Sequence, residues 1–302
     1  MVDDVPSGPL LNRLRIAIGA WQPLTGRGLA AFADASGARI LAFQVVLASL
    51  MALAVVWSAR QIVTTTVEYA LPNLPEEPAG IAQRKLRWPD REVRLLAQSP
   101  HLALAVDPEA TGELGLNGDL QIELGHEALI VRGVLGQSTV GYGSELDLPL
   151  DRTSAVAAWG AWRVPLLAVL GVASVLFFLA TWWVLATLYF LPTWLFGWIL
   201  RRQLTASGAW RLCSASLWPA ALIPGTALLL YTTLWIRLPG LIALWAIHFP
   251  AAWFWLIWSV ISLPARTSGN EVPRPNPFAN ASTDRKRSRS TAEGRARNPF
   301  AD

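Results

Sequence analysis

The sequence has a single cysteine, Cys213, among its 302 residues. An internal disulfide is therefore excluded, as is any zinc or redox site that needs several cysteines. Charged residues are also scarce, because Asp, Glu, Lys and Arg make up only 15% of the chain while 53% is hydrophobic. Soluble domains carry about 25% charged residues. Much of this chain is therefore expected to lie in lipid.

Catalytic motifs are missing too, since neither a Gly-x-Ser-x-Gly nor a Walker-type Gly-rich loop occurs. A metal site could form only if the fold brought together possible ligands that are dispersed in the sequence. The spacing of these residues does not match a known metal-binding motif. These possible ligands are His101, His126, Asp107, Glu123 and Glu127. We expect solvated strand-edge residues instead. The sequence thus predicts no catalytic centre, no cofactor, no metal and no nucleic-acid partner.

Four apolar stretches are long enough to cross a membrane, which takes about 20 residues. Three of them are residues 39–61, 214–236 and 240–263. The fourth lies in an uncharged run, residues 165–200, which would measure about 54 Å as one helix and is too long for a single crossing. We predict a helix over residues 163–190, a break at Pro192 and an interfacial extension over residues 191–200.

Charge sets the predicted orientation, because basic residues near helix ends stay on the cytoplasmic side. Basic residues occupy segments 1–38, 201–213 and 264–302, whereas residues 62–160 hold 14 acidic and 7 basic side chains. We predict a multi-pass protein with both termini cytoplasmic. Twenty-three Arg against two Lys is typical of a GC-rich bacterial genome, which places it in a bacterial inner membrane. The first span could be a cleaved signal peptide, but it lacks a small-x-small site and a retained anchor is favoured.

Residues 62–160 show the alternation of β-strands. Apolar side chains alternate over residues 102–106 and 120–124, near the turn-like pairs Asp107-Pro108 and Asn117-Gly118, and residues 128–135 and 146–150 predict two more strands. The predicted fold class is therefore membrane α-helical, with four transmembrane helices. A small antiparallel β-rich extracytoplasmic domain lies between the first and second.

The two ends of the chain carry different patterns. Within residues 1–38, Leu11, Leu14, Ile18 and Trp21 recur at helical spacing. This pattern fits an in-plane interfacial helix or a helix packed on the bundle. Residues 264–302 are rich in Pro, Asn, Ser, Thr and Arg, so we expect a disordered tail.

Two features of the tail are candidates for binding. The first is a basic cluster formed by Arg285, Lys286, Arg287 and Arg289. This cluster either binds anionic lipid headgroups or only keeps the tail on the cytoplasmic side of the membrane. The tail also repeats Asn-Pro-Phe-Ala, with Asn276, Pro277 and Phe278 in the first copy and Asn298, Pro299 and Phe300 in the second. Asn-Pro-Phe resembles the ligand of eukaryotic EH domains, but a docking motif for another partner, anchored by the two Phe, is favoured.

No charged side chain lies within the apolar runs of the predicted spans, residues 40–57, 165–190, 214–236 and 240–263, although transporters usually retain one. The conspicuous polar candidates are Gln44 and His248, the latter two residues before Pro250. Prolines also lie inside the spans: Pro250 in the fourth, and Pro219 and Pro224 in the third. They mark either discontinuous helices around a substrate site or ordinary helix kinks, and we favour kinks. His248 is either a packed residue or a proton carrier, and the packed reading is favoured.

The order of elements resembles a bacterial membrane family, domain of unknown function 1189. The resemblance spans residues 15–262 and is carried by Trp21-Gln-Pro, Leu71-Pro-Asn-Leu-Pro with Gly80, Leu102-Ala-Leu-Ala-Val-Asp-Pro-Glu-Ala-Thr-Gly and Glu127-Ala-Leu-Ile-Val-Arg. The spacing from Asp107 to Thr111-Gly112 is longer here, and the basic tail has no counterpart. The resemblance implies the architecture and no activity.

Two functional hypotheses follow. The first is a non-enzymatic accessory or sensor-like protein that binds an envelope or membrane partner protein through its outer domain and membrane lipids through its tail. The second is a small-solute or lipid transporter that uses the kinked third and fourth spans. A membrane enzyme ranks third.

Overall fold

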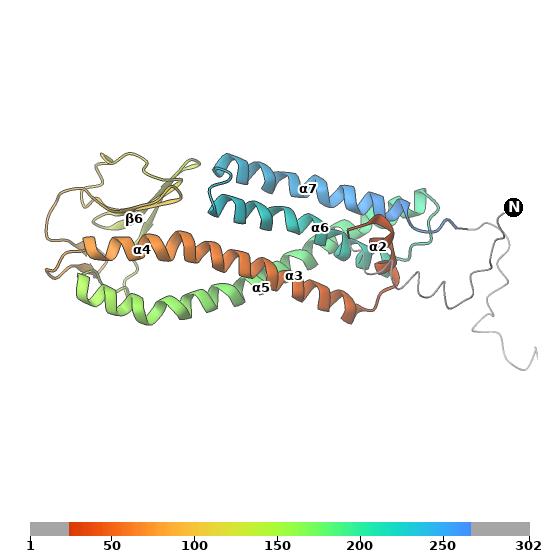
Figure 1. The fold of residues 1–302 in the computed structure, drawn as a ribbon, viewed down its shortest axis with the longest axis horizontal. Coiled ribbons are helices and arrows are strands. Elements are labelled where there is room, and N and C mark those ends of the chain that lie inside the picture. The colour runs from red at the N-terminus through yellow and green to blue at the C-terminus, as the bar shows by residue number, and fades with distance from the viewer. Residues whose placement is uncertain (1–23, 267–302) are drawn as a thin grey trace, which may run out of the picture. The chain divides into compact units, whose positions relative to one another are not determined.

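The computed structural model describes residues 24–266, and four of its helices are long and apolar enough to cross a membrane. Figure 1 shows them side by side, with a β-rich region at one end. Four apolar helices and a small β-rich region between the first two were predicted, and this coarse architecture is confirmed. The predicted amphipathic helix within residues 1–38 and the tail beyond Arg266 lie largely or wholly outside the described residues.

The first spanning segment is longer than predicted. Helix α3 (Gly37–Ala59) begins at Ser36, whose side chain accepts a hydrogen bond from the Arg39 amide. It continues through a π-helical turn, η2 (Arg60–Thr64), then α4 (Thr65–Ala70) and η3 (Leu71–Asn73). The 37 residues together measure about 56 Å, against about 30 Å for the hydrocarbon core. The helix therefore does not end at the predicted membrane boundary, residue 61, but carries on into the β-rich region.

The second span, α5 (Arg152–Ile199), is one helix of 48 residues. It passes through Pro165 and Pro192, so the predicted break at Pro192 is wrong. The interfacial position of residues 191–200 stays a prediction. Local contacts support the helix there: the Thr193 hydroxyl donates to the Tyr189 carbonyl at 2.7 Å, and Gly197 packs against Leu204. Such contacts let a spanning helix tolerate a proline.

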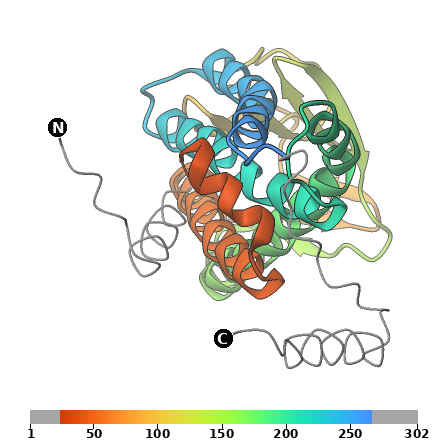
Figure 2. The same ribbon diagram turned by 90° about the vertical axis from the view of Figure 1, so that its right-hand side faces the viewer.

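Helices α6 (Ala206–Thr232) and α7 (Leu238–Ile261) form a hairpin. Helix α6 begins within the predicted loop 201–213, because Thr205 caps it by accepting a hydrogen bond from the Gly208 amide. It is the most buried of the four spanning helices. Figure 2, viewed along the helices, shows the four packed together.

The bundle core is made largely of small and aliphatic side chains. Ala48 of α3, Ala186 of α5 and Leu212 of α6 are all fully buried in it. In a second cluster the ring of Phe43 stacks on Trp218, and the ring of Phe32 meets Trp218 edge to face. Small residues let membrane helices approach closely, because packing rather than water exclusion holds them together.

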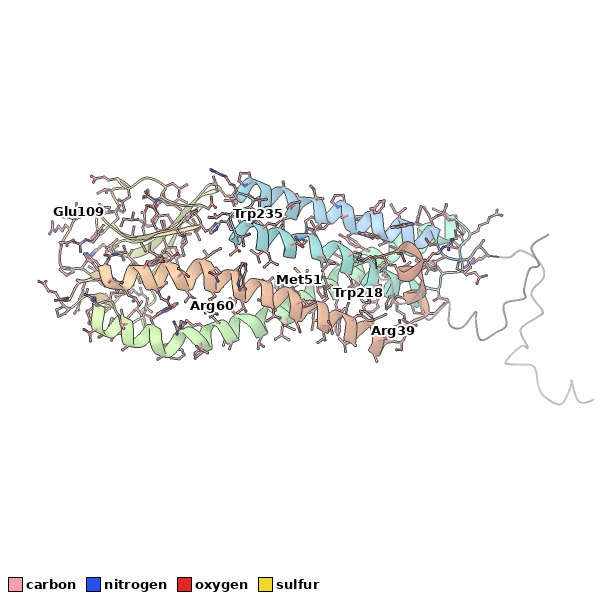
Figure 3. All side chains as sticks on the ribbon, in the orientation of Figure 1. Arg39, Met51, Arg60, Glu109, Trp218 and Trp235 are labelled. Carbon is pink, nitrogen blue, oxygen red and sulfur yellow. The ribbon has the colours of Figure 1, made fainter. Side chains whose placement is uncertain are left out.

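Contacts between helices show which parts lie at the same level. Gly171 of α5 faces Val56 of α3, and the hydroxyls of Thr232 and Ser58 are 2.8 Å apart. The end of the α6–α7 hairpin is thus level with the end of α3. Residues 60–73 and roughly 152–168 extend beyond the hairpin, as Figure 1 shows. In Figure 3, Arg39 and Arg60 lie on either side of Met51, at the two ends of the apolar part of α3.

The β-rich region, called the β-domain here, contains two sheets. The first has the order β2-β1-β8, formed by Lys85–Arg87, Gly80–Ala82 and Leu148–Pro149. The second has the order β3-β4-β5-β6-β7, formed by Arg94–Gln98, Leu102–Val106, Leu120–Leu124, Ala128–Gly133 and Gly136–Gly141. Ala70, Leu74, Leu96 and Val106 join the helices to these sheets in one core.

The expected antiparallel arrangement is wrong at one pairing. Strands β4 and β5 are parallel, with Leu104 opposite Ile122, while the other pairings are antiparallel. A parallel pair needs a crossover of about a dozen residues, and residues 107–119 provide it. The turn-like pairs at its two ends therefore do not close hairpins.

Candidate functional site

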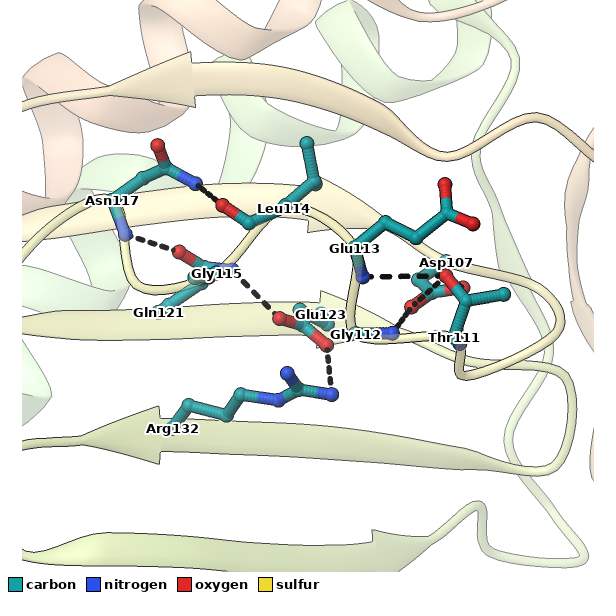
Figure 4. A network of polar contacts seen from close by, with 10 residues as sticks. All are labelled: Asp107, Thr111, Gly112, Glu113, Leu114, Gly115, Asn117, Gln121, Glu123 and Arg132. Carbon is teal, nitrogen blue, oxygen red and sulfur yellow. Dashed lines mark hydrogen bonds and ion pairs between the residues drawn. The ribbon is translucent and has the colours of Figure 1, made fainter.

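The crossover loop, residues 107–119, is held from inside by one carboxylate. Asp107 is 1% exposed, and its oxygens accept hydrogen bonds from the amides of Thr111 at 3.0 Å and Gly112 at 2.8 Å. Gly112 has φ of +71°, a conformation that favours glycine. The loop therefore has a defined shape (Figure 4).

A buried polar chain lies beneath this loop. Gln121 is fully buried; its Oε1 accepts from the Asn117 amide at 2.7 Å and its Nε2 donates to Glu123 at 2.6 Å. Glu123 is 1% exposed and pairs with Arg132 of β6 at 3.2 Å. Because Arg132 packs directly against Gly112, the chain fixes the loop to the sheet.

The far end of the loop joins the β-domain to the bundle. Asp119 Oδ2 accepts a hydrogen bond of 2.8 Å from the hydroxyl of Tyr231, near the end of α6. The ring of His101 packs on Tyr231 at a centroid distance of 4.3 Å, and its Nδ1 lies 3.8 Å from the same carboxylate oxygen. A histidine, a carboxylate and a phenol thus meet where the two parts of the molecule touch.

An apolar cavity of about 400 Å³ lies between the larger sheet, α4 and α5. Every lining side chain is apolar: Leu104, Ile122 and Leu124 come from the strands, Val67 from α4, and Trp159 and Trp162 from α5. This volume falls in the range of small-molecule sites, about 300–1,000 Å³.

A second, polar cavity of about 470 Å³ includes the π-helical turn and the facing part of α5. Arg60, Thr64 and Glu68 line one side and Arg163 the other, and Arg163 donates to Glu68 at 2.7 Å. A third cavity, of about 550 Å³, lies at the opposite end of the bundle and contains Arg27 and Arg202. Both arginine-containing cavities lie near the ends of the spanning helices.

The two polar residues predicted within the spans do not form one site. Gln44 is fully buried, and its Oε1 accepts from the indole of Trp183 at 3.0 Å. His248 contacts the carbonyl oxygen of Trp245 and the ring of Phe249, both on its own helix. Neither residue lines the three cavities above.

The possible metal ligands are not gathered either. Among the described residues no group of three His, Cys, Asp or Glu side chains could hold a metal ion. Asp107 shapes the loop, Glu123 pairs with Arg132, and His101 packs on Tyr231. All three are buried, so the expectation of solvated strand-edge residues is wrong for them. The tail candidates, Asn276 to Phe278, Arg285 to Arg289 and Asn298 to Phe300, lie outside the described residues.

Comparisons with protein-family models, with curated proteins and with solved structures found no match. The resemblance to the family of domain of unknown function 1189 stays a prediction. Function must therefore be argued from the β-domain and its junction with the helices.

Proposed function

We propose that the chain is a non-enzymatic accessory or sensor-like protein of a bacterial inner membrane. Its β-domain faces the envelope and binds a partner protein, and both chain ends face the cytoplasm. The charge distribution around the four apolar helices supports this orientation.

The supporting observation is the open edge of the larger sheet. Strand β7 pairs only with β6, and all six of its residues are exposed. Natural edge strands are usually protected by charge, proline or a bulge. The sequence of β7, Gly-Gln-Ser-Thr-Val-Gly, has neither charge nor proline. The neighbouring turn adds Val134, 63% exposed, and Leu135, 92% exposed.

An extended segment of a partner protein fits such an edge. Main-chain hydrogen bonds to the free side of β7 would supply affinity, and the apolar turn would supply an anchor. The same sheet is fixed to α6 through the crossover loop and Asp119. A partner that binds at the edge and moves the sheet would therefore also move α6. This connection supports the sensor-like part of the proposal.

The edge is tested in cells with a photo-reactive residue at Ser138 of the full chain, compared with one at Glu145 away from the edge. We expect one recurrent protein adduct at Ser138 that disappears when Leu135→Asp and Val140→Lys are introduced together. The purified partner should then bind the unaltered chain and not the double variant. Equal capture at Glu145, or unchanged capture by the double variant, would contradict the proposal.

The tail is proposed to bind the inner face of the membrane or a cytoplasmic protein. Its four clustered basic residues support lipid contact, at about 1 kcal/mol for each charge near an anionic surface. A synthetic peptide of residues 264–302 should bind vesicles containing phosphatidylglycerol, and Gln at positions 285, 286, 287 and 289 should abolish binding. Replacing Phe278 and Phe300 with Ala should leave vesicle binding unchanged and remove only a protein partner.

A further inference from the structure

The apolar cavity between the larger sheet, α4 and α5 has no role in the edge-binding proposal. It is lined by side chains from several elements, among them Leu104 of β4, Leu124 of β5, Leu71 of η3 and Ala155 of α5. Several wall positions are alanines, among them Ala70, Ala105 and Ala158, where larger residues would fill the space.

The composition of the wall restricts what can occupy the cavity. The only polar groups among its lining side chains are the indole N–H groups of Trp159 and Trp162, and β4 and β5 are paired on both edges, so these strands offer no free backbone groups. A peptide would bury its own N–H and C=O groups there without partners, which is costly. A hydrocarbon chain has no such groups, and its transfer from water into the cavity is favourable in free energy.

The mouth of the cavity adjoins the lipid-facing surface of α5. Trp162 and Leu166 line it and are 62% and 52% exposed. The same helix continues into the span with Val169 and Val172 exposed as well. Gly171 faces Val56 near the end of α3, so Leu166, about one and a half turns earlier in α5, is about level with the end of the hairpin. Tryptophan at this depth is typical of the membrane interface.

We propose that this cavity binds an acyl chain of a membrane phospholipid, drawn from the leaflet on the β-domain side. The chain leaves the bilayer along α5, passes Trp162 and lies between β4, β5 and α4. This inference is independent of the partner at β7 and of which side of the membrane the β-domain faces.

The test uses the full chain in vesicles of phosphatidylethanolamine and phosphatidylglycerol, with a trace phosphatidylcholine that carries a diazirine at the end of one acyl chain. After irradiation, adducts are located by peptide mass spectrometry. We expect adducts on Leu104, Ile122 or Leu124, which a chain confined to the bilayer cannot reach. Adducts found only on the spanning helices would overturn the proposal.

A matched pair of variants gives a second measure. Ala158 lines the cavity, whereas the neighbouring Ala157 is exposed and does not. Ala158→Trp should reduce adducts on β4 and β5 about tenfold by filling the cavity, while Ala157→Trp should not. Equal labelling in the two variants would overturn the proposal. So would labelling by a soluble diazirine fatty acid without labelling by the phospholipid. If Ala158→Trp fails to fold, the adduct positions on the unaltered chain still decide.

Discussion

The hydroxyl of Tyr231 lies 2.8 Å from Asp119 Oδ2 and donates a hydrogen bond to it. Tyr231 belongs to a spanning helix and Asp119 to the crossover loop of the β-domain. The loop in turn is fixed to the sheet by Asp107 and by the pair of Glu123 with Arg132. Polar contacts along the loop, joined through its backbone, therefore connect the larger sheet with α6.

Removing the Tyr231 hydroxyl should loosen the junction without unfolding either part. Tyr231→Phe is expected to cost about 1.5–3 kcal/mol, the range for a hydrogen bond to a charged group. Hydrogen exchange should increase in residues 99–120 and stay unchanged in α5. Tyr69→Phe, at a tyrosine that is 65% exposed, is the control. Unaltered exchange in the loop of Tyr231→Phe would show that the contact does not hold the domain.

Breaking the buried pair beneath the loop should have a much larger effect. Glu123 is 1% exposed, so Arg132→Met leaves a buried carboxylate without its partner and is expected to cost about 3–5 kcal/mol. Chemical denaturation followed by tryptophan fluorescence measures the loss. The exposed pair of Arg91 and Glu109, 3.7 Å apart, is the control, and Arg91→Met should cost no more than about 1 kcal/mol. Similar losses at the two pairs would contradict the burial argument.

The close contact of α3 and α6 depends on Gly225. A Cβ atom there would lie 2.5 Å from the sulfur of Met51, the flexible end of a side chain that can shift, so Gly225→Ala should destabilise the bundle by about 1 kcal/mol. Combining it with Met51→Ala should cost less than the sum of the two single changes. Thermal unfolding in detergent measures this coupling. Gly160→Ala is the control and should have little effect, because nothing lies within 4 Å of a Cβ atom there. If the effects of Gly225→Ala and Met51→Ala simply added, the two residues would not be in contact.

Tyr142 of the β-domain should resist ionisation. Burial raises its pKa from 10.0 to about 12, and its hydroxyl donates to the Gly125 carbonyl at 2.9 Å. Because the folded-state pKa is the higher one, its contribution to stability is complete below pH 10 and is lost as the pH rises to about 12. Ultraviolet difference titration of the unaltered chain against Tyr142→Phe measures the shift. A midpoint near pH 10 for this tyrosine would contradict it.

Hydropathy located the four spans because each is an unbroken apolar run, but it missed where the helices end. Arg60, Gln61 and Thr64 end the apolar run of α3, yet the helix continues to Asn73 because its next turns pack on the sheets. Pro192 predicted a break, and contacts of the following turn with α6 and its preceding loop keep the helix continuous.

The β-domain was predictable only in part, because tertiary contacts decide its strand pairing. Alternation found β4 and β5, although β4 is buried on both faces and the fully buried positions of β5 are the polar Gln121 and Glu123. Strand β7 shows no apolar alternation since both of its faces are exposed. The crossover loop between the parallel strands is held by the buried carboxylate of Asp107, whose partners are not recognisable from spacing. The contact of Asp119 with Tyr231, residues 112 positions apart, has no signal in a single sequence.

The most direct test of the account asks on which side of the membrane the β-domain lies. In a Cys213→Ser background, Leu135→Cys places a thiol at the exposed β6–β7 turn and Ser207→Cys places one near the start of α6, both at exposed positions. A membrane-impermeant maleimide is applied to intact spheroplasts and again after permeabilisation. The account predicts labelling of Leu135→Cys in intact spheroplasts and of Ser207→Cys only after permeabilisation. The reverse pattern would place the β-domain in the cytoplasm and contradict an envelope partner.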